Sequence, residues 1–95
     1  MIVHIALFQW KKGTKEKEIN KILGDIRALR EIKGINNIHC GENFSRWAEG
    51  YTHAVVVLAK NTSALKAYME DPVHKKIIEK IEKAEKKSMG IDFEE

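Results

Sequence analysis

Two segments of the chain, residues 2–10 and 51–60, have the β-branched and aromatic composition of strands and carry apolar side chains on both faces. Alternate side chains of a strand point to opposite faces of its sheet, so both segments must be covered on two sides. In the first segment the two faces are formed by Ile2, His4, Ala6, Phe8 and Trp10 and by Val3, Ile5 and Leu7. A sheet built on these strands therefore needs protein on each of its faces.

The segment after the first strand has the three-and-four spacing of an amphipathic helix. Thr14 is expected to cap this helix, and Gly34, which tolerates the left-handed backbone conformation, is expected to end it. The predicted buried stripe consists of Ile19, Ile22, Leu23, Ile26 and Leu29. One side of this helix should therefore pack on the sheet.

A second helical region follows the strand at residues 51–60, and Ser63 is expected to cap it. Proline is tolerated at the first position of a helix and damaging in its interior. Pro72 should therefore interrupt the helix, and Asp71 should cap a new segment. The residues expected to be buried by that segment are Val73, Ile77, Ile78, Ile81 and Ala84.

Two further strands complete the predicted order. Looser alternation predicts a strand at residues 35–43, and a short last strand is expected at residues 89–93. The order is βαββαβ, which in 95 residues predicts a single α+β domain over residues 1–95. The expected architecture is a ferredoxin-like sandwich, with a four-stranded antiparallel sheet and two helices on one face.

Two helices can cover only one face of such a sheet. A fully exposed apolar face would be larger than the patches that monomers usually tolerate, and its burial would be favourable by several kcal/mol at about 25 cal/mol per Å². A second copy packed sheet to sheet around a two-fold axis is the simplest cover. We therefore expect a homodimer forming an α/β barrel, with the face that bears Ala6, Phe8, Val55 and Val57 turned towards the partner.

Strand alternation also places several polar rings on predicted inward faces. His4 shares a face with Ala6 and Phe8, and Tyr51 shares a face with His53. Both histidines can therefore face one partly apolar cavity. The alternative is that each is a core or interface histidine satisfied by a neighbouring hydrogen bond.

The interrupted helix contributes the second half of a candidate site. His74 should lie in the first turn of the segment that begins at Pro72, where the helix dipole disfavours the charged imidazolium and favours the neutral form that a base requires. Tyr68 can bring its hydroxyl to the same cavity and donate to a carbonyl or enolate oxygen. The alternative for Tyr68 is a core tyrosine of an amphipathic helix.

The rest of the sequence argues against other classes of function. The net charge of +3 results from 17 basic and 14 acidic residues that alternate along the helices, which is typical of a solvated surface and not of nucleic-acid binding. No apolar stretch is long enough to span a membrane, and Cys40 is interpreted as a small buried residue in a reducing cytoplasm. The histidines lack the paired spacing of a zinc site, so no metal and no cofactor is expected, and His39 has no assigned role. These histidines are His4, His39, His53 and His74.

Several motifs together resemble the stress-responsive A/B barrel domain (Dabb) family over essentially the whole chain. They are His4 in an opening strand, Gly34, Gly41-Glu42-Asn43-Phe44-Ser45, Gly50-Tyr51-Thr52-His53-Ala54, Tyr68, Pro72 with His74, and Asp92-Phe93. The resemblance implies a ferredoxin-like protomer in a homodimeric α/β barrel. One plant member, olivetolic acid cyclase, closes a polyketide without a cofactor, and its working pair matches Tyr68 and His74, with pocket histidines matching His4 and His53.

Two hypotheses follow. In the first, the protein is a cofactor-independent enzyme or binder of a small apolar or carbonyl-containing ligand, in which Tyr68 and His74 are catalytic and His4, Tyr51 and His53 bind the substrate. In the second, it is a structural or stress-related dimer whose polar residues only satisfy the barrel interior.

Overall fold

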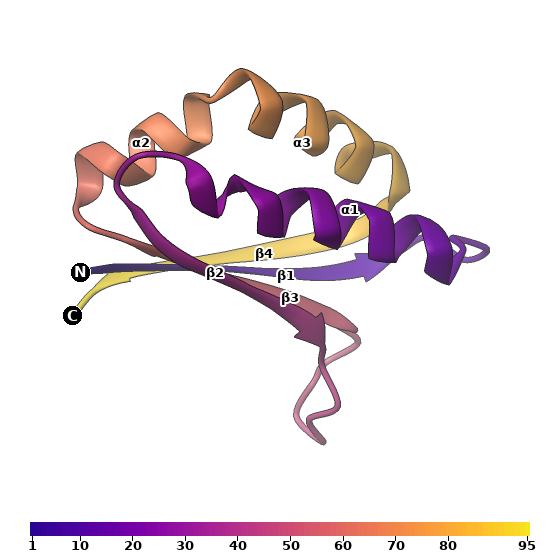
Figure 1. The fold of residues 1–95 in the computed structure, drawn as a ribbon. Helices are drawn as coiled ribbons and strands as arrows, with labels where there is room; N and C mark the ends of the chain where they lie inside the picture. The colour runs from indigo at the N-terminus through magenta and orange to yellow at the C-terminus, as the bar shows by residue number, and fades with distance from the viewer.

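A computed structural model describes all residues from Met1 to Glu95 and contains one four-stranded antiparallel sheet with its helices on one face (Figure 1). The strand order is β2-β3-β1-β4. The elements are β1 (Ile2–Trp10), α1 (Glu16–Ala28), a short 3-10 helix η1 (Leu29–Glu31), β2 (Ile35–Glu42), β3 (His53–Ala59), α2 (Thr62–Glu70), α3 (Pro72–Ala84) and β4 (Glu85–Glu94). The predicted ferredoxin-like α+β fold is confirmed.

The helix-covered face of the sheet contains the core. Phe8, Val55 and Val57 are buried there in one apolar cluster with the predicted stripe of α1 and with Ile77 of α3. The prediction that the face with Phe8, Val55 and Val57 turns towards a partner is therefore wrong. Alternation shows which side chains share a face, but it does not show which face the helices cover.

The opposite face of the sheet, called the open face below, has no helix on it (Figure 1). The strand register places odd-numbered residues of β1 opposite odd-numbered residues of β4 and even-numbered residues of β3. The apolar residues of the open face are Val3, Ile5, Leu7, Ala54, Val56, Leu58, Met89, Ile91 and Phe93. In the single chain, Met89, Ile91 and Phe93 of this face are 41 to 45% exposed.

The last strand is longer than the predicted strand at residues 89–93. β4 begins at Glu85, directly after α3, and pairs with the whole length of β1 from Trp10 to Ile2. Its first half contains Lys86, Lys87 and Ser88, whose polarity conceals the strand in the sequence. The free edge of β1 supplies the hydrogen-bond partners that local sequence preference does not indicate.

Two of the three predicted helix caps differ in the structure. α1 begins at Glu16 without a side-chain cap, and the Thr14 hydroxyl instead donates to the Lys11 carbonyl at 2.7 Å. Asn61, and not Ser63, caps α2 by accepting a hydrogen bond from the Ala64 N–H at 2.9 Å. Asn61 precedes Ser63 by two residues, so the helix starts earlier than predicted.

The predicted break at Asp71 and Pro72 is confirmed. One carboxylate oxygen of Asp71 accepts hydrogen bonds from the N–H groups of Val73 at 2.8 Å and His74 at 3.2 Å, and Pro72 occupies the first turn of α3. Val73 was expected to be buried but is 56% exposed, because its side chain faces a surface hollow between α1 and α3, whereas His74 in the same turn faces the sheet. The other predicted core positions of α3 pack as expected, with Ile78 only partly buried.

Candidate functional site

A cavity of about 270 Å³ lies between α3 and strands β1 and β4. Three of its lining side chains carry rings that can exchange or donate a proton: His4 from β1, Tyr68 from α2 and His74 from α3. Much of the remaining wall is apolar. It includes Ala6, Phe8, Ile26, Val55, Met69, Ile78 and Ile81.

Small residues on the two strands leave space for this cavity. Gly90 of β4 lies directly opposite Ala6 of β1, and both line the cavity with Ser88. A Cβ atom at Gly90 would meet no atom within 4 Å, and its backbone φ is not positive. A larger side chain at Gly90 would therefore enter the open space without backbone strain.

The helix break brings Tyr68 and His74 together. Six residues of a continuous helix would turn the second side chain by about 240° from the first, away from the same wall. The chain instead ends α2 at Glu70 and restarts at Pro72, and the two ring centroids lie 4.4 Å apart with the ring planes inclined by 48°. Both side chains are buried.

The surroundings of His74 favour its neutral form. Burial is the main cause that lowers the pKa of His74; the nearby backbone of Met69 acts in the opposite direction, His4 lowers the pKa further and Asp71 raises it. The Nδ1 atom of His74 is buried without a hydrogen-bond partner. Buried polar atoms without a partner are rare in folded proteins and call for an explanation.

Tyr68 keeps its proton. Burial raises the pKa of the Tyr68 hydroxyl, and the nearby Cys40 thiol adds to this effect. A neutral phenol is a hydrogen-bond donor, whereas a neutral imidazole can accept a proton. The pair therefore combines a donor and an acceptor in one cavity wall.

His4 approaches the pair from the sheet. Its ring centroid lies 6.4 Å from that of Tyr68, in an edge-to-face arrangement. Its Nδ1 contacts the carboxylate of Asp92, which lies directly opposite on β4. A carboxylate at Nδ1 holds the proton there and leaves Nε2 as the acceptor.

Asp92 was not predicted as a functional residue. It appears in the sequence only as part of the Asp92-Phe93 motif. Its place beside His4 depends on the pairing of β1 with β4, and only the register of that pairing could have revealed it.

The other two predicted substrate-binding residues lie elsewhere. His53 pairs with Phe8 whereas His4 pairs with Val57, so the two histidines are four residues apart along β1, about 13 Å at 3.3 Å per residue. The Nδ1 of His53 accepts a hydrogen bond from the Trp10 indole at 3.0 Å and lies 2.8 Å from the Thr52 hydroxyl. His53 therefore matches the alternative of a satisfied core histidine.

Tyr51 also lies away from the cavity. It is buried just before β3, and the Lys87 amino group lies 4.9 Å from the centre of its ring. Lys87 pairs with Gln9, an odd-numbered position, so this contact is on the side of the open face. The structure thus brings together three of the five predicted residues, His4, Tyr68 and His74.

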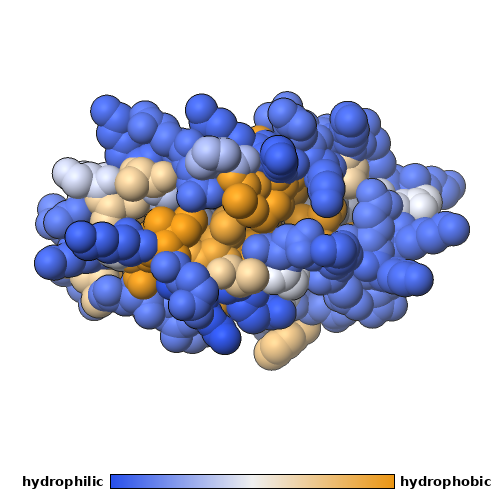
Figure 2. Space-filling model, turned by 45° about the horizontal axis from the view of Figure 1, so that its top comes forward, coloured by the Kyte–Doolittle hydropathy of each residue, from blue (hydrophilic) through white to orange (hydrophobic).

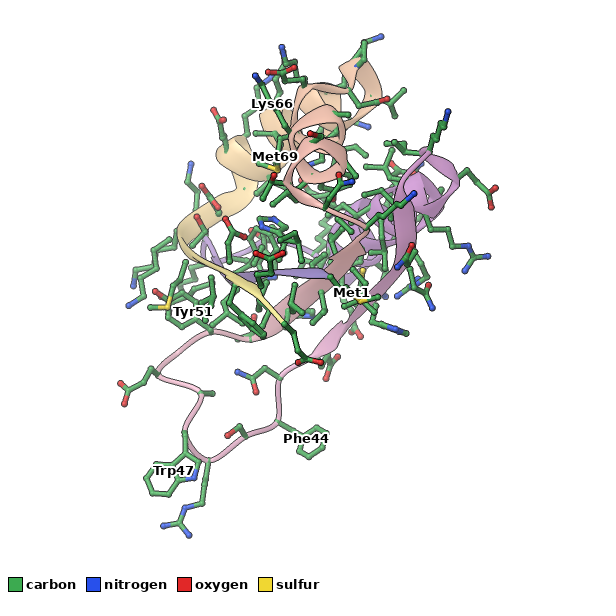
Figure 3. The ribbon with its side chains drawn as sticks, turned by 90° about the vertical axis from the view of Figure 1, so that its left-hand side faces the viewer. Met1, Phe44, Trp47, Tyr51, Lys66 and Met69 are labelled. Carbon is green, nitrogen blue, oxygen red and sulfur yellow. The ribbon has the colours of Figure 1, made fainter.

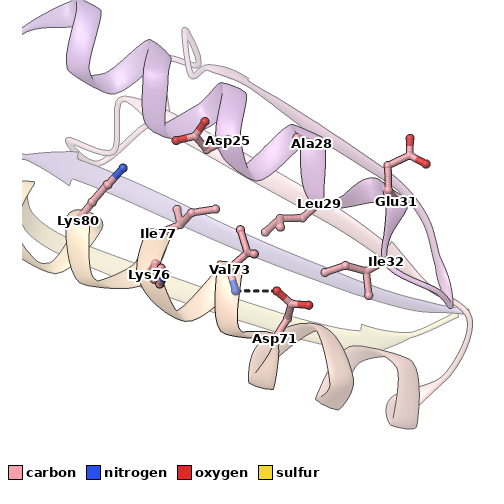
Figure 4. A pocket seen from close by; sticks show the side chains of 10 residues that line it. All are labelled: Asp25, Ala28, Leu29, Glu31, Ile32, Asp71, Val73, Lys76, Ile77 and Lys80. Atoms are coloured by element: carbon pink, nitrogen blue, oxygen red, sulfur yellow. Dashed lines mark hydrogen bonds between the residues drawn. The ribbon is translucent and has the colours of Figure 1, made fainter.

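A larger hollow of about 590 Å³ lies in the helical layer between α1 and α3, where apolar side chains reach the surface (Figure 2). Leu29, Ile32 and Ile77 line it together with charged side chains such as Lys80 (Figure 4). It contains no histidine, cysteine or tyrosine. Despite its size, this groove therefore lacks the proton-transfer groups of the smaller cavity.

No helix of the structure has the length and apolar character needed to cross a membrane. No three His, Cys, Asp or Glu side chains gather into a group that could hold a metal ion.

The fold and the cavity define a class of small ferredoxin-like α+β proteins with a pocket between the sheet and the second helical region. Residues 2–95 match the family model of the Stress responsive A/B Barrel Domain (Dabb). The chain belongs to this family. No curated protein matches the chain at a significant level.

Solved structures of low sequence identity share the fold. A protein of Arabidopsis thaliana is 21% identical, with a TM-score of 0.91 over 100% of this chain and 95% of that chain. A protein of Thermobifida fusca, described as dimeric, ferredoxin-like and of unknown function, is 24% identical, with a TM-score of 0.85 over 97% and 88%. A hydroxynitrile lyase of Passiflora edulis is 18% identical, with a TM-score of 0.87 over 97% and 90%.

Proposed function

We propose that the protein is a cofactor-independent enzyme that moves a proton on a small carbonyl compound held between Tyr68 and His74. One observation carries this proposal: a neutral, incompletely bonded histidine and a protonated tyrosine lie 4.4 Å apart, centroid to centroid, in the wall of a largely apolar cavity. Perturbed titratable groups in a pocket are typical of functional sites. The Passiflora edulis hydroxynitrile lyase supports the view that this fold can carry an enzyme.

In the proposed reaction, the His74 imidazole takes a proton from the carbon next to the carbonyl group. The electron pair of that C–H bond forms a carbon–carbon double bond, the π pair of the carbonyl moves to its oxygen, and the Tyr68 hydroxyl stabilises the resulting enolate by a hydrogen bond. His4, held by Asp92, orients the ligand through its Nε2. The protonated imidazole exchanges its proton with solvent and returns one to the carbon, which completes an exchange. Cyclase-like or lyase-like chemistry begins with the same proton abstraction.

The charges around the cavity favour a neutral ligand. Glu82 and Glu85 are among the lining residues, and no lysine or arginine is. A carboxylate ligand would lose hydration without gaining a cationic partner and would be repelled by the two glutamates. We infer that the substrate class is compact and uncharged.

We also propose that two copies associate through the open face. Nine apolar residues lie on that face, and three of them are more than 40% exposed in the single chain. Structures of the same fold that are described as dimeric support a dimer. Two sheets packed in this way would form a barrel-like dimer.

The activity is tested by proton exchange. Deuterium incorporation next to the carbonyl of cyclohexanone is followed by NMR in D₂O, with wild type compared to His74→Gln and Tyr68→Phe. Each substitution is expected to lower the enzyme-catalysed rate about a hundredfold or more. Lys17→Gln, which changes an exposed residue of α1 outside both the cavity and the open face, serves as the control and should exchange at the wild-type rate. No exchange by the wild type with any small ketone would favour the alternative of a structural dimer.

The ligand charge is tested with a matched pair of ketones, 4-oxocyclohexanecarboxamide and 4-oxocyclohexanecarboxylate. The neutral amide should exchange faster, and Glu82→Gln with Glu85→Gln should reduce the difference. Equal rates for the two ketones in the wild type would contradict the proposed charge selection while leaving the roles of Tyr68 and His74 intact.

A further inference from the structure

The connection between β2 and β3, residues 43–50, carries the two most exposed large apolar side chains of the protein. We call this connection the arm. Phe44 is 99% exposed and Trp47 is 75% exposed, and the Arg46 guanidinium lies 4.6 Å from the centre of a Trp47 ring. Figure 3 shows both aromatic rings on the arm, pointing away from the body of the protein. Exposed aromatic residues of this kind mark interaction sites.

The arm is held in shape by its own hydrogen bonds. The Asn43 side chain accepts from the Ser45 N–H at 3.1 Å and donates to the Tyr51 carbonyl at 2.8 Å. The Ser45 hydroxyl accepts from the Trp47 N–H at 3.0 Å. At the base, Gly50 adopts a positive φ of 86°. The backbone that carries the two aromatic rings is therefore already ordered, which lowers the cost of ordering the arm on binding.

The arm and the open face lie on the same side of the sheet. The helices cover the opposite side, and the arm extends away from them in two perpendicular views (Figures 1 and 3). A body that covers the open face must therefore lie beside the arm. The apolar surface of the sheet and the aromatic arm are accessible to one and the same partner.

We propose that the arm grips the second copy of the chain, with Phe44 and Trp47 of each protomer buried against the partner's flank. This inference rests on the dimer proposed above. The charge of the arm supports a protein partner over a membrane, because Glu42 and Glu49 flank the single cation Arg46 and anionic lipids attract polybasic segments. In a two-fold dimer both arms make the same contact, so Phe44 and Trp47 each contribute two buried side chains, one from each protomer.

The test follows the two tryptophans of the chain, Trp10 and Trp47, in protein labelled with 5-fluorotryptophan. The ¹⁹F signal of Trp47 is assigned by its loss in Trp47→Ser, and sedimentation velocity on the same samples reports the association state. As the protein associates, the H₂O/D₂O isotope shift of the Trp47 signal is expected to fall. The signal of the buried Trp10 should keep its small isotope shift throughout.

The double substitution Phe44→Ser with Trp47→Ser is expected to weaken association at least about a hundredfold, because each ring counts twice. Val73→Ser removes an exposed apolar side chain from the helical layer and should associate like the wild type. Both variants change solvent-exposed residues, so their folds should be retained.

The outcomes separate the arm from the dimer. If the protein associates while Trp47 stays fully exposed, and the double variant associates with unchanged affinity, the arm contact is overturned and the dimer remains. A monomer at all concentrations would overturn both proposals. Protection of Trp47 only when phosphatidylserine vesicles are added would overturn the second copy as the occupant of the arm and identify a membrane instead.

Discussion

At the scale of single residues, His74 couples the stability of the fold to pH. Its pKa is lowered by burial, whereas in the unfolded chain it has the ordinary value of about 6.5. Between its lowered folded pKa and about pH 6.5, the unfolded state binds more protons than the folded state. Stability is therefore complete above about pH 6.5 and decreases as the pH falls below it.

We predict that the free energy of unfolding of the wild type falls between pH 7.5 and pH 5 and falls less steeply in His74→Gln. Urea denaturation across this range measures both slopes. Lys17→Gln changes an exposed residue of α1, away from His74 and the open face, and should keep the wild-type slope. Identical slopes in wild type and His74→Gln would contradict a neutral, buried His74.

Gly90 carries the second residue-scale prediction. Gly90→Val should stabilise the fold by about 0.5 to 1 kcal/mol, because valine favours a strand and loses less conformational freedom than glycine. The same side chain should fill part of the cavity and block cyclohexanone exchange. Gly24→Ala in α1, where an added Cβ also meets nothing within 4 Å, should stabilise by a similar amount and leave exchange unchanged. A Gly90→Val protein that exchanges normally would place the reaction elsewhere.

Single-residue roles were predictable where local sequence determines them. Tyr68 and His74 flank a proline whose effect on a helix is local, so their proximity could be predicted from the sequence. Asp92 and Gly90 depend on the pairing of β4 with β1, which joins residues more than eighty positions apart. Likewise, His53 and His4 point to the same face of the sheet, but the antiparallel register pairs His53 with Phe8, four residues along β1 from His4.

At the scale of elements, the interruption between α2 and α3 shapes the site. The Asp71 carboxylate accepts two backbone N–H groups at the start of α3 and also raises the pKa of His74, against the larger effect of burial. A capping residue thus contributes both to the helix and to the candidate base.

We predict that Asp71→Ala destabilises the fold by about 1 kcal/mol and lowers the pKa of His74 further. Urea denaturation measures the first effect, and NMR titration of the His74 ring measures the second. Asn61→Ala removes the equivalent cap of α2 and should cost a similar amount without moving the His74 titration. An unchanged His74 titration in Asp71→Ala would show that Asp71 caps α3 without influencing the pKa of His74.

The elements themselves were largely predictable, and their ends were less so. The apolar spacing of α1 and the alternation of β1 span many residues, so each gives a strong signal. A cap depends on one residue among several candidates. The backbone is extended at Asn61 and already helical at Ser63, so Asn61 is the cap. The polar start of β4 has no local signal, because its pairing is supplied by the edge of β1.

At the scale of the whole molecule, the helices cover one face of the sheet and leave the other face open (Figure 1). The sequence indicates that both faces of the sheet are apolar. Because β1 and β3 are apolar on both sides, their composition does not indicate which face the helices cover. The helices take the face with Val55 and Val57, where the stripe of α1 packs. The face with Ile5, Leu7 and Ile91 has no helix on it (Figure 1) and packs against the second copy in the proposed dimer.

The last prediction concerns this open face. Ile91 pairs with Ile5 near the middle of β1 and is 41% exposed in the single chain, so a charged side chain there can remain hydrated in a folded protomer. In a dimer packed through the open face, Ile91→Glu would bury two uncompensated carboxylates, which is costly. Sedimentation equilibrium should therefore show a folded monomer for Ile91→Glu at concentrations where the wild type is dimeric. Val73→Glu places the same charge on the helical layer and should dimerise normally; if Val73→Glu abolished association and Ile91→Glu did not, the partner would lie on the helices instead.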